Sequence, residues 1–309
     1  MPKFEEFTYP SSTGKNRIYA RLCLPDGAVR GVVQIVHGIA EHIGRYEGFM
    51  LFLAQHGFAA VGEDHLGHGR SYSNEKEQGF FSEENGWDHV VQDLLCLNRQ
   101  MHEKFPGIPY IMFGHSMGSF LTRTFLIRYP GQYDLAILSG TGHQSSLLVR
   151  SGLLLSSLLC KTQGADATGE RLNQIAFGSY LKRIPNARTP YDWLTTVPEV
   201  VDAYIADEKC GFVCKNSLYR DMMQGIAYIT DPKNIAQMNK EKPVYFMSGA
   251  EDPVGEYGKG VEKAYKAFCD AGCKDVMIRL YPGGRHEMLN ETSREQVYQD
   301  ILSWIESRL

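Results

Sequence analysis

The sequence contains no apolar stretch long enough to cross a bilayer. Its most apolar run, residues 147–160, is interrupted by Arg150 and falls short of the roughly 20 residues that a membrane-spanning helix needs. Residues 1–10 carry charged side chains and no apolar run, so they do not resemble a secretory leader or a transit peptide. We therefore expect no transmembrane segment and no cleaved leader.

A large excess of charge of either sign is also missing. The 309 residues include 32 Lys and Arg against 36 Asp and Glu, which gives a formal net charge of -4. Proteins that bind nucleic acid normally carry a basic patch or a clearly positive charge. We therefore expect no nucleic-acid partner. No internal repeat or low-complexity tract is visible, which excludes a solenoid.

The seven cysteines are an odd number and, without an export signal, indicate free thiols in a reducing compartment, which the cytoplasm fits best. Two pairs with three intervening residues, Cys210/Cys214 and Cys269/Cys273, would supply four zinc thiolates only if the fold brought them together. Zinc motifs favour two intervening residues, and buried free cysteine is common. We expect no metal and no cofactor.

Short β-rich runs alternate with amphipathic helical stretches over much of the chain. We predict strands at residues 15–24, 31–37, 58–63, 110–113, 135–138, 244–247 and 276–280, and helices at residues 88–104, 116–129, 257–270 and 293–308. This alternation favours right-handed crossovers between parallel strands. The predicted fold class is therefore α/β, with a mostly parallel sheet that helices cover on both faces.

The alternation is lost between residues 143 and 230, where Leu-rich helical stretches and Gly and Pro breaks replace the β-rich runs. We interpret this segment as an insertion between two strands. The chain then divides into a first part of the core at residues 1–142, a helical cap at 143–230 and a second part of the core at 231–309. An insertion of this kind emerges above the sheet edge where parallel sheets bind ligands, so it is a candidate lid.

The segment Gly114-His115-Ser116-Met117-Gly118 matches the pattern Gly-x-Ser-x-Gly between a predicted strand and a predicted helix. In that context the serine lies on a sharp turn that exposes its hydroxyl above the sheet, and the glycines let strand and helix approach closely. The helix N-terminus also favours a developing negative charge. Ser116 is therefore the candidate nucleophile.

A serine nucleophile needs a neutral imidazole to accept its proton and a carboxylate to orient that imidazole, and in this architecture both follow the serine in the sequence. His286 follows the last predicted strand, and the other nine histidines all precede residue 144. Asp252 directly follows the strand predicted at 244–247, which makes it the candidate acid. Glu251 is its main rival, and Asp275 is a second one.

The residues after the strand at 31–37 are expected to complete an oxyanion hole. In such sheets this loop lends one backbone N–H, which here is that of Ile39, and the residue after the nucleophile, Met117, lends the other. The polar loop that follows, residues 41–46, would border the cleft. Its side chains would hydrogen-bond a polar leaving group or simply lie in solvent.

Three segments resemble the monoacylglycerol lipase and lysophospholipase group of the α/β-hydrolases. They are residues 37–46 (HGIAEHIGRY), 64–71 (DHLGHGRS) and 114–118 (GHSMG). The resemblance implies an α/β-hydrolase fold. It also implies a catalytic triad of Ser116, Asp252 and His286. The amides of Ile39 and Met117 would form the oxyanion hole.

The resemblance also implies that Glu41 and Arg45 lie near the glycerol part of the substrate. The sequence departs from the family at residue 39, where a small residue is usual and Ile39 would narrow the acyl or alcohol site. The insertion carries no motif that matches the family, so the resemblance does not extend to lipid preference. Residues 64–71 read as a structural turn, to which we assign no chemistry.

Apolar side chains gather in the insertion. A leucine cluster near its start comprises Leu153, Leu154, Leu155, Leu158 and Leu159. Core packing is the default for such a cluster, but an open face would guide an acyl chain or make transient contact with a membrane surface. Six aromatic residues would either line an apolar tunnel or form the insertion's own core: Phe177, Tyr180, Tyr191, Trp193, Phe212 and Tyr219.

We therefore expect a metal-independent serine hydrolase that cleaves small-molecule carboxylic esters, with monoacylglycerols and lysophospholipids favoured. A short-chain esterase and an aminopeptidase or amidase are alternatives, and a ligand-binding protein without turnover is a third. An aminopeptidase would hold a substrate ammonium with an acidic cluster, for which the insertion offers Glu199, Asp202, Asp207 and Glu208. Dehalogenases and epoxide hydrolases need a carboxylate at position 116. The sequence does not determine the oligomeric state.

Overall fold

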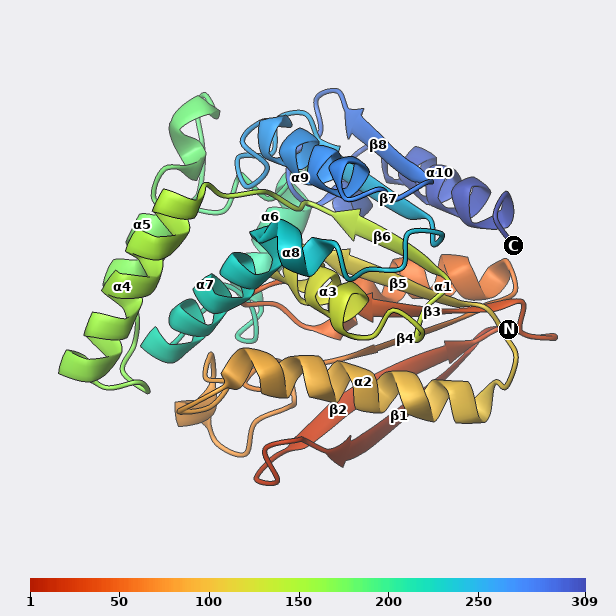
Figure 1. The fold of residues 1–309 in the computed structure, drawn as a ribbon, viewed down its shortest axis with the longest axis horizontal. Coiled ribbons are helices and arrows are strands. Elements are labelled where there is room, and N and C mark those ends of the chain that lie inside the picture. Colours follow the sequence, from red (N-terminus) through yellow and green to blue (C-terminus); the bar gives the residue numbers. More distant parts are fainter.

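The computed structural model describes all residues, 1–309, and has at its centre a single sheet of eight strands (Figure 1). The strand order is β1-β2-β4-β3-β5-β6-β7-β8. The six strands from β4 to β8 in this order are parallel, whereas β1 and β2 run antiparallel at one edge. The strands are β1 (Lys3–Pro10), β2 (Arg17–Leu24), β3 (Gly31–Val36), β4 (Phe58–Glu63), β5 (Tyr110–His115), β6 (Leu135–Ser139), β7 (Val244–Gly249) and β8 (Val276–Tyr281).

Every residue of the five strands β3 to β7 is buried, which explains why these segments are mainly apolar runs instead of alternating, with few polar residues such as Gln34 and Glu63. One face packs against α2 (Gly86–Lys104), α3 (Met117–Arg128) and α9 (Lys259–Asp270). The other face packs against α1 (Glu47–Gln55) and α10 (Arg294–Glu306). The predicted α/β class with a mostly parallel, doubly covered sheet is confirmed.

Two elements were not anticipated from the sequence. The strand β1 lies at the sheet edge, where half-exposed charged residues replace the apolar run that identified the central strands. The helix α1 is buried along most of its length, and it has no side-chain N-cap to mark its start. Both elements therefore lack the local signals on which the strand and helix predictions depended.

Residues 143–230 leave the core after β6 and return before β7, and we call them the cap. The cap helices are α4 (Ser146–Gln163), α5 (Glu170–Phe177), α6 (Pro198–Ala206) and α7 (Asn216–Thr230), and the short α8 (Pro232–Ile235) leads back to β7. The only β pairing within the cap is an isolated bridge between Thr168 and Lys215. Helix α7 packs on α3 and α2 of the core, and α4 packs on α7, so α4 and α5 are the helices most distant from the sheet (Figure 1).

One buried arginine on α3 joins that helix to both ends of the cap. The guanidinium of Arg123 donates from Nη1 to the carbonyl of Gly142 at 2.8 Å and from Nη2 to the carbonyl of Ile229 at 3.2 Å. Arg123 is fully buried and pairs with no carboxylate, and burial lowers its pKa to about 9. The entry and the exit of the cap are therefore held by the same side chain.

Candidate functional site

Ser116 occupies a sharp turn between the end of β5 and the start of α3. Its backbone has φ 54° and ψ −124°, a conformation that L-residues rarely adopt and that commonly marks functional sites. The turn requires glycine on both sides. A Cβ on Gly118 would lie 2.0 Å from the carbonyl oxygen of Val36, and one on Gly114 would lie 2.3 Å from Thr122 Oγ1. The neighbouring elements thus hold the serine above the carboxyl edge of the sheet.

His286 and Asp252 follow β8 and β7 at the same edge, and they are hydrogen-bonded to each other. The distance from His286 Nδ1 to Asp252 Oδ2 is 2.9 Å, and both side chains are buried. Asp252 also accepts from the hydroxyl of Ser248 at 2.9 Å and from the backbone N–H of Val254 at 2.9 Å. The carboxylate is therefore fixed by three donors.

The two rival acids lie elsewhere. Glu251 is exposed, whereas Asp275 forms an ion pair with Arg308 at 2.8 Å. Ser248 was not singled out from the sequence. Its position four residues before Asp252, at the end of the strand, is the only signal that would have indicated it.

The electrostatics of the pair favour its ionised form. Burial by itself would raise the pKa of Asp252, but His286 and the donated hydrogen bonds outweigh this and lower it. Burial by itself would lower the pKa of His286, but the Asp252 carboxylate outweighs this and raises it. Since Nδ1–H donates to Asp252, Nε2 of the neutral imidazole remains free to accept a proton.

Ser116 and His286 line the same cavity, although no hydrogen bond joins them in this structure. The imidazole packs against two other rings, with His115 at 4.6 Å and Trp193 at 5.1 Å between ring centroids. Gly140, with φ 58°, passes so close that a Cβ would lie 2.8 Å from Cε1 of His286. The catalytic hydrogen bond of such sites is often formed only when substrate binds.

The loop after β3 brings Ile39 to the wall of the same cavity, whereas Met117 is not among the lining residues. A Cβ on Gly38 would lie 3.1 Å from Cβ of Ser116, so the loop passes directly beside the serine. Met117 begins α3, and its amide belongs to the unpaired N–H groups of the helix N-terminus. Ala40, with φ 52°, turns its carbonyl toward the cap, where it accepts from Gly211 N–H and from the Tyr204 hydroxyl, both at 2.9 Å.

Glu41 and Arg45 belong to a buried ion-pair network, and only Glu41 lines the cavity. Arg45 donates to Glu41 at 2.8 Å and to both carboxylate oxygens of Glu287 at 2.6 and 2.8 Å. Burial would raise the pKa of Glu287, but Arg45 outweighs it and lowers that pKa to about 2. Arg45 thus lies behind the cavity wall, and Glu287, which the sequence analysis did not identify, neighbours His286 along the chain.

The cavity has a volume of about 440 Å³ and lies between the sheet edge and the cap. Five of the six aromatic residues of the predicted tunnel line it, namely Phe177, Tyr191, Trp193, Phe212 and Tyr219. The sixth, Tyr180, packs edge-on against Trp193 at 4.9 Å between centroids. A cavity of this size that combines aromatic and apolar walls with several polar and charged side chains is suited to a small organic molecule.

The acidic residues proposed for an aminopeptidase do not reach this cavity. Asp202 pairs with the exposed Arg188 at 2.8 Å, and Asp207 pairs with His42 at 2.8 Å. Glu199 and Glu208 likewise are not among the lining residues. The carboxylates that do line the cavity are those of Glu41, Glu170 and Glu287.

The two cysteine pairs do not form a common zinc site. All seven cysteines are free, and the only group of three or more residues with metal-ligating side chains brought together is His42, Asp207 and Cys210. This group lies outside the Ser116 cavity.

Comparison with known proteins identifies relatives along the whole chain. The family described as serine aminopeptidase, S33, matches residues 27–293. A monoacylglycerol lipase of Mycolicibacterium smegmatis is 29% identical, over 97% of this chain and 96% of that protein. A thermostable carboxyl esterase from Bacillus coagulans, solved in complex with glycerol, superposes with a TM-score of 0.92 at 28% identity, covering 99% of this chain and 98% of the other. A lipase in its open form gives a TM-score of 0.88 at 27% identity, covering 99% of both chains.

Proposed function

The chain belongs to the serine aminopeptidase S33 family of hydrolases, and we propose that it cleaves monoacylglycerols or similar single-chain carboxylic esters through an acyl-enzyme. The observation that carries the proposal is the position of Ser116, which faces a largely apolar cavity together with the His286–Asp252 pair. The names of the relatives agree with it, since they include a monoacylglycerol lipase and a carboxyl esterase.

Acylation begins when the Ser116 hydroxyl attacks the ester carbonyl carbon and His286 Nε2 accepts its proton. The carbonyl oxygen becomes an oxyanion, which accepts hydrogen bonds from the amides of Ile39 and Met117. Asp252 holds the imidazole in its tautomer and stabilises the imidazolium. Collapse of the intermediate then breaks the ester bond, and His286 gives its proton to the leaving alcohol.

Deacylation repeats these roles with water in place of the serine. His286 removes a proton from the water, whose oxygen attacks the acyl carbon, and the same two amides hold the second oxyanion. The proton then passes to Ser116 Oγ as the carboxylic acid leaves. Arg45 acts through its carboxylate partners and not by contact with substrate, whereas Glu41 and Glu287 are the groups of that network that line the cavity and are available to an alcohol leaving group.

A single-chain lipid ester fits the walls of the cavity better than a peptide does. The aromatic lining accommodates an acyl chain, and no acidic cluster of the cap faces the cavity to hold an N-terminal ammonium. The aminopeptidase alternative would need Glu170, on cap helix α5, for that role. A test on aminoacyl amides with Glu170→Gln as the variant separates the two functions.

We further propose that the cap makes transient contact with lipid surfaces. Four leucines of α4 are largely exposed, namely Leu147, Leu148, Leu154 and Leu158, and Ile175 of α5 is 65% exposed. Exposed apolar side chains concentrated on one part of a protein commonly mark such contacts. No helix of the structure combines the length and apolarity needed to cross a membrane. The seven free cysteines support the proposal that the protein works in the cytoplasm.

The decisive experiment measures hydrolysis of glycerol monoesters and nitrophenyl esters over a series from acetyl to palmitoyl chains. Ser116→Ala is the test variant, and Ser303→Ala, which removes an exposed hydroxyl on α10, is the control. We expect turnover with an optimum at medium or long monoacylglycerols that Ser116→Ala abolishes and Ser303→Ala preserves. A preference for acetyl esters would indicate a general esterase. Turnover that survives in Ser116→Ala would contradict the mechanism.

A further inference from the structure

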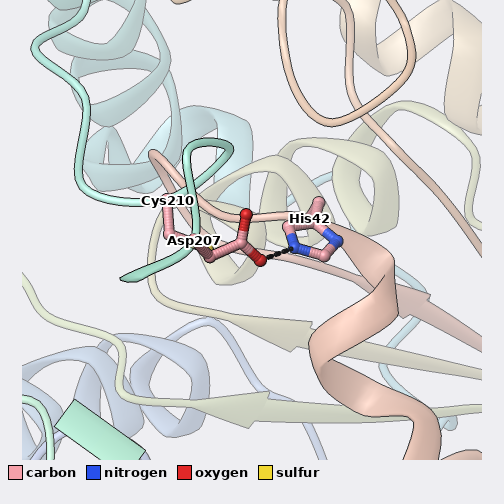
Figure 2. A group of neighbouring side chains, drawn as sticks. All are labelled: His42, Asp207 and Cys210. Atoms are coloured by element: carbon pink, nitrogen blue, oxygen red, sulfur yellow. Dashed lines mark hydrogen bonds and ion pairs between the residues drawn. The ribbon is translucent and has the colours of Figure 1, made fainter. Parts of the chain in front are cut away.

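Three side chains that bind metals in other proteins meet where the cap touches the core. His42 comes from the loop that follows the oxyanion residues, and Asp207 and Cys210 come from the cap segment after α6 (Figure 2). One ligand atom of each residue lies within 4.8 Å of those of the other two. The group is therefore assembled from segments about half the chain apart.

Hydrogen bonds orient the two polar members. His42 Nδ1 accepts from the backbone N–H of Gly44 at 3.2 Å, so the ring carries its proton on Nε2 and donates it to Asp207 Oδ2 at 2.8 Å (Figure 2). The other oxygen of Asp207 accepts from the N–H of Lys209 at 2.9 Å. The N–H of Cys210 donates to the Asp207 carbonyl at 2.9 Å, which closes the turn that places the thiol beside the carboxylate.

The donor set selects the ion. One imidazole nitrogen, one thiolate and one carboxylate suit Zn²⁺, whereas Mg²⁺ and Ca²⁺ prefer oxygen ligands alone. The two negative charges of a Cys210 thiolate and Asp207 balance a divalent ion. The side chains of His42 and Asp207 are 19% and 37% exposed, which leaves a solvent-facing side for a fourth ligand, a water molecule.

Neighbouring charges are compatible with a cation at this position. Arg45 and Lys209 are the nearby positive groups; two carboxylates, Glu41 and Glu287, already pair with Arg45, and Lys209 lies close to Asp207. Lys209 is therefore the positive charge that remains beside the site, while the Cys210 thiolate and Asp207 neutralise the bound ion.

We propose that His42, Asp207 and Cys210 form a zinc site that bridges the cap to the oxyanion loop. On binding, the Cys210 thiol releases its proton to solvent and the sulfur coordinates the ion. The imidazole moves its proton from Nε2 to Nδ1, and Nε2 coordinates in place of donating to Asp207. The hydrogen bond from Gly44 is given up, and the three coordinate bonds replace it.

The position of the site defines its effect. Ala40, two residues before His42 and next to Ile39, already accepts hydrogen bonds from Tyr204 and Gly211 of the cap. Zinc adds a further connection between the same two segments, namely the loop that carries the Ile39 amide and the cap segment that carries Cys210. The ion thus connects the cap to the core and takes no part in ester cleavage.

The test titrates the full-length protein, freed of metal by a chelator that is then removed, with Co²⁺ as a spectroscopic probe. We expect one equivalent to bind, with visible bands of a tetrahedral ion and a near-ultraviolet band from thiolate to cobalt. Zn²⁺ should displace the Co²⁺, and Mg²⁺ should not. Cys210→Ser should lose the thiolate band, and the matched control Cys269→Ser, which removes an exposed cysteine on α9, should keep it. A band that is absent from the unmodified protein, or that persists in Cys210→Ser, overturns the proposal.

A second measurement covers the case in which Cys210→Ser does not fold. Zn²⁺ should raise the Tm of the unmodified protein and of Cys269→Ser. The variant Asp207→Asn, which alters a partly exposed side chain, should bind Co²⁺ at least about tenfold more weakly and should lose most of the Tm shift. Unchanged affinity in Asp207→Asn overturns the proposal. Neither readout depends on ester hydrolysis, so failure here and failure of the proposed function are distinguishable.

Discussion

The central strands of the sheet and the outer cap helix α4 differ in the fraction of their residues that is buried. All residues of strands β3 to β7 are buried, whereas only Val149, Ser156 and Leu159 of the 18 residues in α4 are. The groups assigned to chemistry follow the buried strands, and the residues assigned to the substrate's acyl chain come largely from the cap. Cap helix α7, on which α4 packs, is itself buried at nine of its 15 residues, so the contrast lies between the sheet and the outer cap helix α4.

The largest effect on activity is expected at the candidate catalytic groups that follow the buried strands. Asp252→Asn should lower kcat by about 10⁴-fold with little change in KM, because the imidazole loses its orientation and its counter-charge. Because Asp252 raises the pKa of His286, the acid limb of the kcat/KM profile should also move to lower pH in the variant. Stopped assays from pH 5 to 9 check both effects. A variant with nearly full activity would transfer the role to another carboxylate.

A matched pair of leucine truncations compares the two regions directly. Leu138→Ala, in β6, removes a fully buried side chain and should lower the free energy of unfolding by about 2–5 kcal/mol. Leu154→Ala, in α4, removes a side chain that is 73% exposed and should change it by less than about 0.5 kcal/mol. Urea denaturation measures both. Leu154→Ala should instead weaken binding to lipid vesicles, and a large loss of stability in this variant would show that α4 is part of the core.

The cap lining should affect chain length and not the reaction itself. Phe177→Ala, in α5, removes an aromatic wall of the cavity. We expect kcat/KM for long-chain monoacylglycerols to fall about tenfold, because apolar contact of this size is worth roughly 1–3 kcal/mol. The value for acetyl esters should stay nearly constant, since a short chain does not reach the wall. An equal fall for all chain lengths would place Phe177 in the catalytic part.

A smaller effect concerns a carboxyl group buried in the sheet. The pKa of Glu63 is raised to about 8, mainly by burial; the Tyr9 hydroxyl that donates to Glu63 partly offsets this rise, and the nearby Asp64 adds to it. The folded protein keeps this proton between pH 4.5 and 8, where the unfolded chain has lost it, so Glu63 makes stability fall as pH rises through this window.

Glu63→Gln is neutral in both states and should remove this contribution. As the pH rises from 6 to 8, the free energy of unfolding of the variant should increase by about 1 kcal/mol or more relative to that of the unmodified protein. Denaturation of both proteins at both pH values measures the difference in the free energy of unfolding. A constant difference between the two proteins would mean that Glu63 is ionised in the folded state.

The fold class was predicted from the alternation of apolar strands with amphipathic helices, and this prediction is confirmed. The central strands are buried on both faces, so their apolar runs are visible locally. The turn at Ser116 is equally visible, because it needs glycine at two fixed positions. The edge strand β1 was missed because its stability comes from pairing with β2 and not from an apolar pattern.

Contacts between distant segments were beyond the reach of the sequence pattern. The ion pair between Arg45 and Glu287 joins residues 242 positions apart, and it withdraws Arg45 from the cavity that Glu41 lines. The His42–Asp207 contact joins the core to the cap in the same way, over 165 positions. Spacing within one motif carries no information about such partners, and they emerge only when both segments are placed in space.

The hydrogen bonds from Arg123 to the carbonyls of Gly142 and Ile229 have a consequence for engineering variants with a different cap. A single guanidinium is only a few ångströms across, so the two points where the cap leaves and rejoins the core are close together in space. Closing a loop between near neighbours costs little chain entropy. A short linker can therefore join the two ends of the cap at little cost in chain entropy, provided that two backbone carbonyls are again offered to Arg123 and that the faces of α2 and α3 covered by α7 are covered again.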